Sequence, residues 1–438
     1  MPNHTIKHLP NLTTEVSAME NRQHEAGKVY HNYFQRGNFR LAANKYDEAI
    51  QDYNEAITLN PNYAKSYKNR GLAYFAKGEI DLAIADYNRA IELDPNNAHA
   101  YNNRGTAYST KGDLHLAIRD FNKAIHLKSD LAEAYNGRGL TYRAKGELDQ
   151  AIEDYNIAIK LRYDHAKAYN NRGNAYRAKG DVEQAIEDIS KAIEFRPMFA
   201  EAYSNRGNAY VRKGLINLAL KDYNQAIRLN PTLAEAYCNR GVAYEYRGEF
   251  ECAIEDYTKA IDLQPDYAEA YNNRGVVYNK QAESNLAIKD FGKAIELKSE
   301  FARAYGGRGY AYYAKGEYNR AIVDYNTAIE LKPNFAEVYN NRGLAYLAEG
   351  ELELAIDDLD KAIESNPDYA EAYYNRGVVW SQRQQWENAR LDLKVANIIG
   401  KDSIRSLQHI NRSVVNFKQL RNVNPPEDIA AMLAPPQA

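Results

Sequence analysis

The side chains that could do chemistry in this sequence are either scattered or repeated at a fixed interval. The two cysteines, Cys238 and Cys252, lie fourteen residues apart and form neither a disulfide framework nor a metal-ligand pattern. His4 and His8 fall in an N-terminal segment outside any periodic pattern, so we do not assign them to a metal site. The sequence contains no phosphate-binding glycine loop and no cluster of a nucleophile with a base. We therefore expect a protein that is not an enzyme and that holds no cofactor or metal.

One polar residue recurs at a fixed position before an Arg-Gly pair. This residue is asparagine in eight places: Asn69, Asn103, Asn171, Asn205, Asn239, Asn273, Asn341 and Asn375. Asparagine is a mediocre helix former, so its recurrence in a helical pattern requires a cause. A carboxamide carries a donor and an acceptor, which match the N–H and C=O groups of an extended peptide backbone. The same carboxamides could instead bond to a neighbouring helix and set the superhelical pitch, and the sequence leaves both alternatives open.

Arginine occupies the next position in every copy, and aspartate follows it sixteen residues later, as in Arg172 and Asp188. An arginine between packed helices needs a carboxylate partner, because a buried charge without one is strongly unfavourable. We predict a repeated Arg–Asp pair that supports the fold and binds no ligand.

These polar positions belong to a repeat of thirty-four residues. The copy that begins at Ala64 reads AKSYKNRGLAYFAKGEIDLAIADYNRAIELDPNN, and the pattern occurs eleven times in all. Within this copy Tyr67 and Gly71 share one helical face, and Ala83 and Tyr87 share a second. A single helix pair cannot bury its apolar stripe, so neighbouring copies must stack into an elongated structure with a concave face.

The recurring tyrosine, glycine, alanine and proline positions resemble the tetratricopeptide repeat family. The resemblance implies an all-α fold, a right-handed superhelical α-solenoid of antiparallel helix pairs. It also implies that the first helix of each pair lines a groove in which an extended peptide or a partner helix binds. The resemblance indicates no particular partner, because one scaffold serves many functions.

The repeats define the expected domain organisation. An amphipathic stretch follows them and suggests a helix that covers the last repeat, and a Pro-Pro segment comes after it. We expect a flexible N-terminal leader at 1–29, the eleven-repeat superhelix at 30–403, a capping helix at 404–420 and a loosely attached tail at 421–438.

The composition of the chain narrows the classes of partner that it could bind. The net charge is −3 and acids and bases are interspersed, so no broad basic field favours nucleic acid or a membrane surface. The absence of a signal peptide or transmembrane stretch leads us to expect a cytoplasmic protein. Four residues, Arg143, Lys167, Arg177 and Arg212, would place positive charge on the concave face, where an acidic segment would bind. Alternatively, they are solvated charges at helix ends that bind nothing.

Several departures from the repeat recur 170 residues apart. Glycine replaces the asparagine at Gly137 and Gly307, and phenylalanine replaces a tyrosine at Phe121 and Phe291. This spacing indicates duplication of a block of five repeats. Each half could hold a similar binding subsite, or the shared departures could be inherited drift.

The sequence thus predicts a non-catalytic scaffold or adaptor that binds an extended partner segment in its concave groove. One alternative is the targeting subunit of an enzyme complex whose catalytic chain is separate. RNA binding by helical repeats is a further alternative, which the charge balance opposes. Self-association by stacking of solenoid ends also stays open, and the identity of the partner and the pathway do not follow from the sequence.

Overall fold

The computed structural model describes residues 29–400 and 425–433, and all regular elements in these ranges are helices. The chain forms two compact units, 1–213 and 214–438, and each is described by itself. The N-terminal leader expected at 1–29, apart from its last residue, and the capping helix expected at 404–420 lie outside the described residues.

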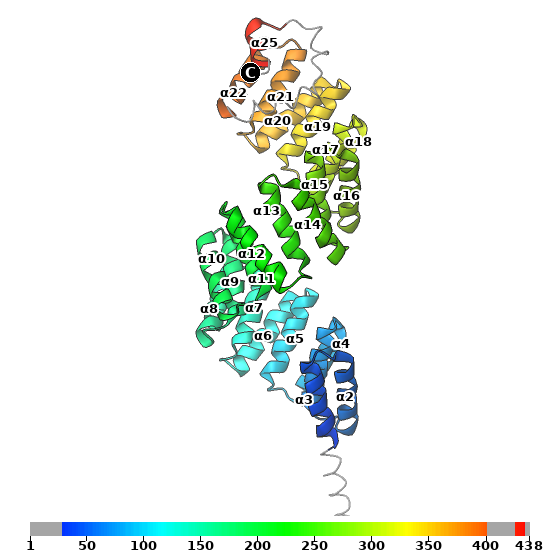
Figure 1. Cartoon of the computed structure of the whole chain (residues 1–438), viewed down its shortest axis with the longest axis vertical. Coiled ribbons are helices and arrows are strands. Elements are labelled where there is room, and N and C mark those ends of the chain that lie inside the picture. Colours follow the sequence, from blue (N-terminus) through cyan, green and yellow to red (C-terminus); the bar gives the residue numbers. More distant parts are fainter. Residues whose placement is uncertain (1–28, 401–424, 434–438) are drawn as a thin grey trace, which may run out of the picture. The chain divides into compact units, whose positions relative to one another are not determined.

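In the first unit, consecutive helices lie side by side and form pairs (Figure 1). The helices are 29–42, α2 (Tyr46–Leu59), α3 (Ala64–Ala76), α4 (Ile80–Leu93), α5 (Ala98–Lys111), α6 (Leu114–Leu127), α7 (Ala132–Ala144), α8 (Leu148–Leu161), α9 (Ala166–Lys179), α10 (Val182–Phe195) and α11 (Ala200–Arg212). The second helix of each pair also packs against the first helix of the next pair.

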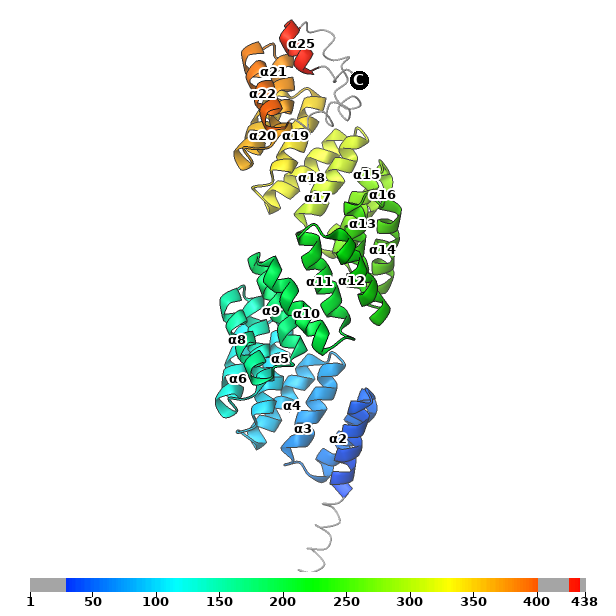
Figure 2. The ribbon, with the colours of Figure 1, turned by 60° about the vertical axis from the view of Figure 1, so that its left-hand side comes forward.

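The second unit repeats this arrangement, as Figures 1 and 2 both show. Its helices are α12 (Ile216–Leu229), α13 (Ala234–Tyr246), α14 (Phe250–Leu263), α15 (Ala268–Lys280), α16 (Ser284–Leu297), α17 (Ala302–Ala314), α18 (Tyr318–Leu331), α19 (Ala336–Glu349), α20 (Leu352–Ser365), α21 (Ala370–Gln382), α22 (Trp386–Ile399) and α25 (Glu427–Leu433). The expected all-α fold of stacked helix pairs is confirmed.

Small residues let the two helices of a pair approach closely. In the pair α3 and α4, the Tyr87 ring lies against Gly71, and a Cβ added at Gly71 would lie 2.7 Å from Tyr87 Cε1. Ala83 and Ala90 on the facing side of α4 are fully buried. Any larger residue at these positions would separate the helices, so the periodic glycine and alanine residues determine the spacing of the layers.

The turn between the helices of a pair places one residue in the left-handed region, with φ 82° at Gly78 and 75° at Gly316. In the α15–α16 turn the corresponding residue is an alanine, Ala282, which adopts φ 60°. A side chain at positive φ is strained, since its Cβ crowds the following carbonyl oxygen.

We expect Ala282→Gly to raise the free energy of unfolding by about 1 kcal/mol, because glycine adopts this conformation without strain. Urea unfolding followed by circular dichroism measures the change. The matched control is Gly316→Ala in the next repeat, which should lower stability by a similar amount. Equal stability of the parent and Ala282→Gly would show that the turn is not strained.

A short helix closes the C-terminal end of the second unit. On α25, Ile429 and Leu433 are spaced by four residues and are buried against Leu393 of α22. Arg390 Nε of α22 lies 2.6 Å from Asp428 Oδ2. This packing differs from the loosely attached tail expected at 421–438, because one apolar face and one ion pair hold the helix in place.

Candidate functional site

The Arg–Asp pattern forms a ladder of paired charges between the helices. Arg70 Nε lies 2.8 Å from Asp86 Oδ2, and Arg70 Nη2 lies 2.6 Å from Asp86 Oδ1. The same two-bond geometry joins Arg104–Asp120, Arg138–Asp154, Arg172–Asp188, Arg240–Asp256, Arg274–Asp290, Arg308–Asp324, Arg342–Asp358 and Arg376–Asp392. The aspartates are buried. The predicted structural pairing is therefore confirmed.

Each guanidinium also reaches back to the preceding repeat. Arg70 Nη1 donates to Asn54 Oδ1 at 2.6 Å, and the guanidinium carbon lies 5.6 Å from the centre of the Tyr67 ring. One arginine thus joins its own second helix to the second helix of the repeat before. Among the described residues Arg308 lacks this third bond, because Gly292 occupies the position of the acceptor.

Burial is the dominant influence on several of these carboxylates. It raises the pKa of Asp86, Asp154 and Asp256, and the hydrogen bond and charge of the paired guanidinium only partly offset this effect. In these three pairs, therefore, desolvation offsets part of the attraction between the carboxylate and the guanidinium.

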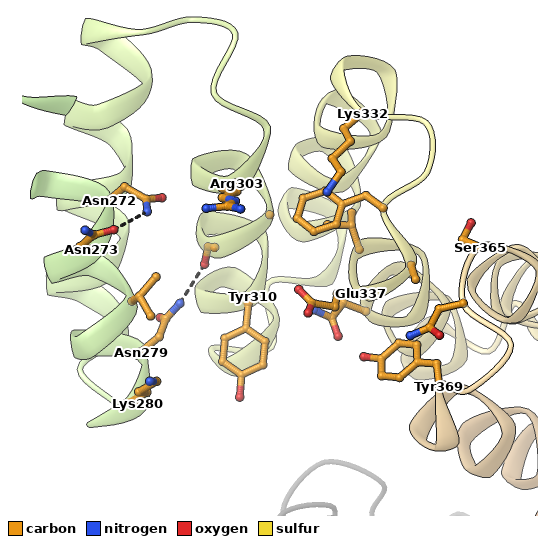
Figure 3. A pocket seen from close by; sticks show the side chains of 18 of the residues that line it. Asn272, Asn273, Asn279, Lys280, Arg303, Tyr310, Lys332, Glu337, Ser365 and Tyr369 are labelled. Carbon is orange, nitrogen blue, oxygen red and sulfur yellow. Dashed lines mark hydrogen bonds between the residues drawn. The ribbon is translucent and has the colours of Figure 1, made fainter. Parts of the chain in front are cut away.

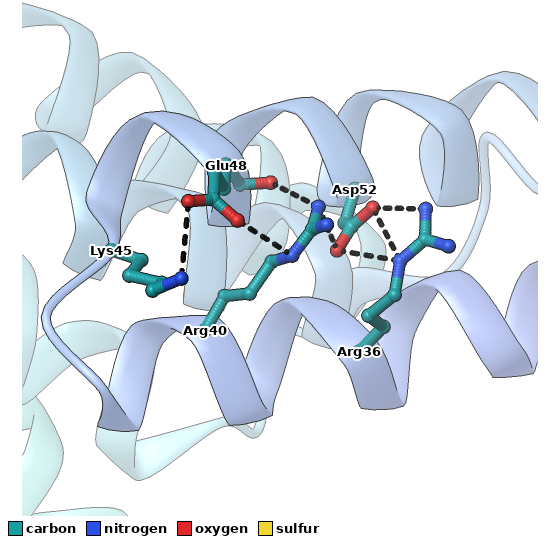
Figure 4. Close-up of polar contacts among 5 residues, drawn as sticks. All are labelled: Arg36, Arg40, Lys45, Glu48 and Asp52. Atoms are coloured by element: carbon teal, nitrogen blue, oxygen red, sulfur yellow. Dashed lines mark hydrogen bonds and ion pairs between the residues drawn. The ribbon is translucent and has the colours of Figure 1, made fainter.

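The first repeat shows a variant of the ladder (Figure 4). Asp52 Oδ1 lies 2.6 Å from Arg36 Nη2, and Asp52 Oδ2 lies 2.8 Å from Arg40 Nη1. Arg40 Nε also lies 3.2 Å from Glu48 Oε2, which lies near Lys45. Arg36 is half-exposed, and the second arginine compensates for the weaker enclosure of the pair.

The asparagine positions form hydrogen bonds between successive repeats. The Nδ2 atom donates to the side chain thirty-five residues earlier in four of them: Asn171 to Asn136 at 2.9 Å, Asn205 to Asn170 at 3.0 Å, Asn375 to Asn340 at 2.8 Å and Asn273 to Cys238 Sγ at 3.7 Å. Asn69 Nδ2 donates to Asn38 Oδ1, thirty-one residues earlier, at 2.7 Å. Asn103 and Asn341 instead accept from the residue before them. These bonds correspond to the alternative in which the repeated asparagines, which we call the asparagine ladder, set the superhelical pitch. The Oδ1 atoms of Asn171 and Asn205 accept no hydrogen bond within the described residues, so they are free to meet a ligand.

Two glycines interrupt this asparagine ladder for a packing reason. A Cβ added at Gly137 would lie 2.6 Å from Phe121 Cε1, and one added at Gly307 would lie 2.4 Å from Phe291 Cζ. The phenylalanine ring of one repeat fills the space that the asparagine of the next repeat would need. The change from tyrosine to phenylalanine in one repeat and the change from asparagine to glycine in the next are therefore linked, because the ring occupies the volume that the asparagine side chain would need.

The position of the ring explains the exchange. In tyrosine repeats the ring lies against its own repeat, with Tyr87 Cε1 2.7 Å from the position of a Cβ at Gly71. Phe121 Cε1 lies 3.1 Å from the position of a Cβ at Gly105, so the phenylalanine ring is displaced toward the next repeat. Only glycine at the ladder position accommodates that displacement.

The four predicted cationic residues all lie on first helices of the first unit. Arg212 Nη1 donates to the carbonyl oxygen of Arg177 at 2.7 Å, and Arg177 Nη2 lies 3.3 Å from Asn174 Oδ1. Arg143 is half-buried near the end of α7. Lys167 is exposed at the start of α9, ten residues before Arg177. The structure thus brings Arg177 and Arg212 together and leaves Lys167 at the opposite end of the helix.

A hollow of about 980 Å³ lies against α17 in the second unit, and we call it the α17 hollow. Residues of α13, α15, α17 and α19, all first helices, line it, and the predicted residues Asn273 and Asn341 are among them. Figure 3 shows Arg303 and Tyr310 on α17 and Lys332 from the adjoining turn around the same space. These three residues were missed in the sequence, although Arg303 stands where the neighbouring repeats have glutamate.

A smaller hollow of about 500 Å³ adjoins the α17 hollow, and the predicted residue Asn239 lines it. The two share Asn272, Asn273 and Arg303. At the rim of the α17 hollow, Lys280 Nζ lies 2.7 Å from Glu245 Oε1. This ion pair neutralises one end of the space, and the other charged residues that line it are Arg303, Lys332 and Glu337.

The cysteines have no catalytic setting. Burial raises the pKa of the Cys238 thiol to about 12, so the thiol stays protonated at neutral pH. Within 29–400 and 425–433, no set of three histidine, cysteine or acidic side chains is arranged to hold a metal ion. No helix in these ranges combines the length and the apolar composition that a bilayer crossing requires.

Stacked helix pairs whose first helices line a hollow define a helical-repeat scaffold for protein interactions. Matches to the family described as TPR repeat occur at 33–78, 71–112, 139–177, 173–214, 207–245, 246–281, 309–350 and 343–384, and matches to Tetratricopeptide repeat at 98–131 and 268–301. Because these matches cover most of the chain, the protein belongs to the tetratricopeptide repeat family. Members of this family bind protein or peptide partners.

Several solved structures are similar to this chain. The crystal structure of the APC/C hetero-tetramer Cut9-Hcn1 matches with 16% identity and a TM-score of 0.53, over 83% of this chain and 94% of that one. A tetratricopeptide repeat protein from Parabacteroides merdae matches with 26% identity and a TM-score of 0.45, over 54% and 93%. YrrB, described as a TPR protein with an unusual peptide-binding site, matches with 28% identity and a TM-score of 0.33, over 42% and 95%. A comparison with curated proteins finds no match.

Proposed function

We propose that the chain is a non-catalytic scaffold that binds an extended segment of a partner protein along the first helices of its repeats. The α17 hollow carries this proposal, because four first helices line it with carboxamides, cations and aromatic rings. Such a lining suits a polypeptide, whose backbone needs hydrogen-bond partners and whose side chains need apolar and charged contacts.

The asparagine ladder supports the proposal through its hydrogen-bond acceptors and not through its donors. In Asn171 and Asn205 the Nδ2 atom bonds to the preceding repeat, so the Oδ1 atom is the group available to a ligand. An amide oxygen accepts a hydrogen bond from a backbone N–H whatever the side chain of that residue. The ladder would therefore hold the backbone of a partner without reading its sequence.

The cations of the first unit favour an acidic segment. Lys167 is exposed, and Arg177 and Arg212 lie close together on adjacent first helices. Positive charge along a binding face speeds the association of an acidic partner and selects against a basic one.

Site-specific photo-crosslinking tests the proposal. A photoreactive amino acid replaces Lys167 on the first helix α9, and in the matched control it replaces Lys160 on the second helix α8. Both lysines are exposed, so neither change should affect folding. We expect illumination in cell lysate to attach a discrete partner protein at position 167 and not at 160. Adducts at position 160 alone, or the same proteins at both positions, would contradict binding along the first helices.

A further inference from the structure

An ion pair joins the first helix to the end of the second helix in two repeats. Arg162 Nη1 lies 2.7 Å from Glu133 Oε1, and Lys298 Nζ lies 3.2 Å from Glu269 Oε1. In both repeats the glutamate is the second residue of the first helix, and the cation follows the second helix. The pair thus neutralises the charge at this end of the repeat.

The repeat of α17 and α18 reverses one of these two charges. Arg303 takes the place of the glutamate, whereas Lys332 keeps the cation. Both line the α17 hollow, and neither forms an ion pair with any carboxylate of the described residues. Lys332 Nζ lies 4.2 Å from the centre of the Phe335 ring instead. Apart from the Lys280–Glu245 pair, the charged residues that line the hollow are these two cations and one carboxylate, Glu337, and the excess of positive charge indicates a site for an anionic group.

An unpartnered acceptor lies beside these cations. Asn272 is 6% exposed, and its Oδ1 atom is buried without a hydrogen-bond partner. In other repeats the corresponding oxygen accepts from the next ladder asparagine, as Asn136 Oδ1 does from Asn171. Gly307 removes that donor at Asn272. In Figure 3 the Asn272 oxygen lies on the side of Arg303, and Asn272 Nδ2 donates to Asn273.

The floor of the hollow is also specific to this repeat. Gly306 stands where α7, α9 and α19 have asparagine, and a Cβ added there would lie 3.1 Å from Val338 Cγ2. Gly306 and Gly307 line the hollow together with Val276 and Val338. The space is apolar at its floor and cationic at its edge.

We propose that the α17 hollow is the subsite that selects the partner, and that it takes an acidic side chain of an extended peptide between Arg303 and Lys332. A backbone N–H of the same peptide donates to Asn272 Oδ1, in place of the missing ladder asparagine. An adjacent apolar side chain of the peptide packs against Val276 and Val338, which also line the hollow. A polyanion such as a nucleic acid fits less well, because Glu337 also lines the hollow. This inference rests on the proposed binding of an extended segment.

Peptide selection followed by affinity measurement tests this assignment. Random peptides of about 12 residues, extended far enough to span several repeats, are selected on the full chain. One selected peptide is then labelled for fluorescence anisotropy. We expect an aspartate or glutamate at a fixed distance from an apolar residue. Arg303→Glu should weaken binding about 30-fold, the loss typical of breaking an enclosed charge pair. Gly306→Asn should weaken it as well, because it fills the hollow.

A second peptide, in which an amide replaces the acidic side chain, makes the test specific. It should bind the parent weakly, yet bind Arg303→Glu no worse than the acidic peptide does. Lys160→Glu, at an exposed position of the second helix α8, is the matched control and should leave the affinity unchanged. Thermal melts establish that all variants are folded.

The outcomes separate this inference from the proposed function. Selected peptides that bind Arg303→Glu and Gly306→Asn as tightly as the parent would overturn the α17 subsite and leave groove binding intact. Preferential binding of a single-stranded oligonucleotide over every peptide would also overturn it. A failure to select any peptide, together with no crosslink at position 167, would overturn both.

Discussion

Asp188→Ala is expected to lower the free energy of unfolding by about 3–5 kcal/mol, the loss found when one partner of a buried ion pair is removed. Asp188 is 1% exposed and accepts hydrogen bonds of 2.7 Å from both Arg172 Nε and Arg172 Nη2. Without the carboxylate, the guanidinium stays between the helices with Asn156 as its remaining acceptor. Urea unfolding monitored by circular dichroism measures the loss.

Two controls identify the cause of that loss. Glu187→Ala removes an exposed carboxylate one residue away and should change stability by less than about 0.5 kcal/mol. Replacing Arg172 and Asp188 together by leucine should be less damaging than Asp188→Ala alone, because no buried charge is then left without a partner. If Asp188→Ala unfolds at the same urea concentration as the parent, the Arg–Asp ladder does not support the fold.

Gly137→Asn should lower the free energy of unfolding by about 3 kcal/mol, near the upper end of the range for overpacked cores. The new Cβ would lie 2.6 Å from Phe121 Cε1 and 2.7 Å from Phe121 Cζ, and both atoms belong to a ring that is 1% exposed. Chemical unfolding of the full chain measures the effect.

Phe121→Tyr in the same chain should recover most of this stability. The double variant restores the combination of tyrosine and asparagine that Tyr87 and Asn103 already show one repeat earlier. The new asparagine could also donate to Asn102 Oδ1, which is buried without a partner. A double variant no more stable than Gly137→Asn alone would mean that the two departures are unrelated.

Much of the fold follows from the sequence because the same pattern of packing and charged residues recurs in eleven copies. The spacing of Tyr67, Gly71 and Tyr87 predicts two helices that approach closely, and the structure places the Tyr87 ring against Gly71. An arginine in a packed pattern requires a carboxylate, and only one acidic position is shared by all copies. The Arg–Asp pairing could therefore be predicted from burial and charge alone.

The candidate site was less predictable, because it depends on how side chains of different repeats face one another. The direction of the hydrogen bond from Asn171 to Asn136 is a matter of geometry that spacing does not contain. Arg303 was visible as a departure from glutamate, yet only the structure places it beside Lys332. The α25 helix was missed because seven residues after a Pro-Pro pair carry too little periodicity to predict an anchored helix.

The phenylalanine and glycine exchange also restricts how the chain can change its length. Most 34-residue modules present the same contacts to both neighbours, so a copy can be lost or gained without creating a new interface. Phe121 and Gly137 belong to adjoining modules, as do Phe291 and Gly307. A recombination break between the members of either pair would place a displaced phenylalanine ring against an asparagine. We therefore expect such a break to destabilise the array, whereas duplication of a block of five repeats keeps both members of each pair together.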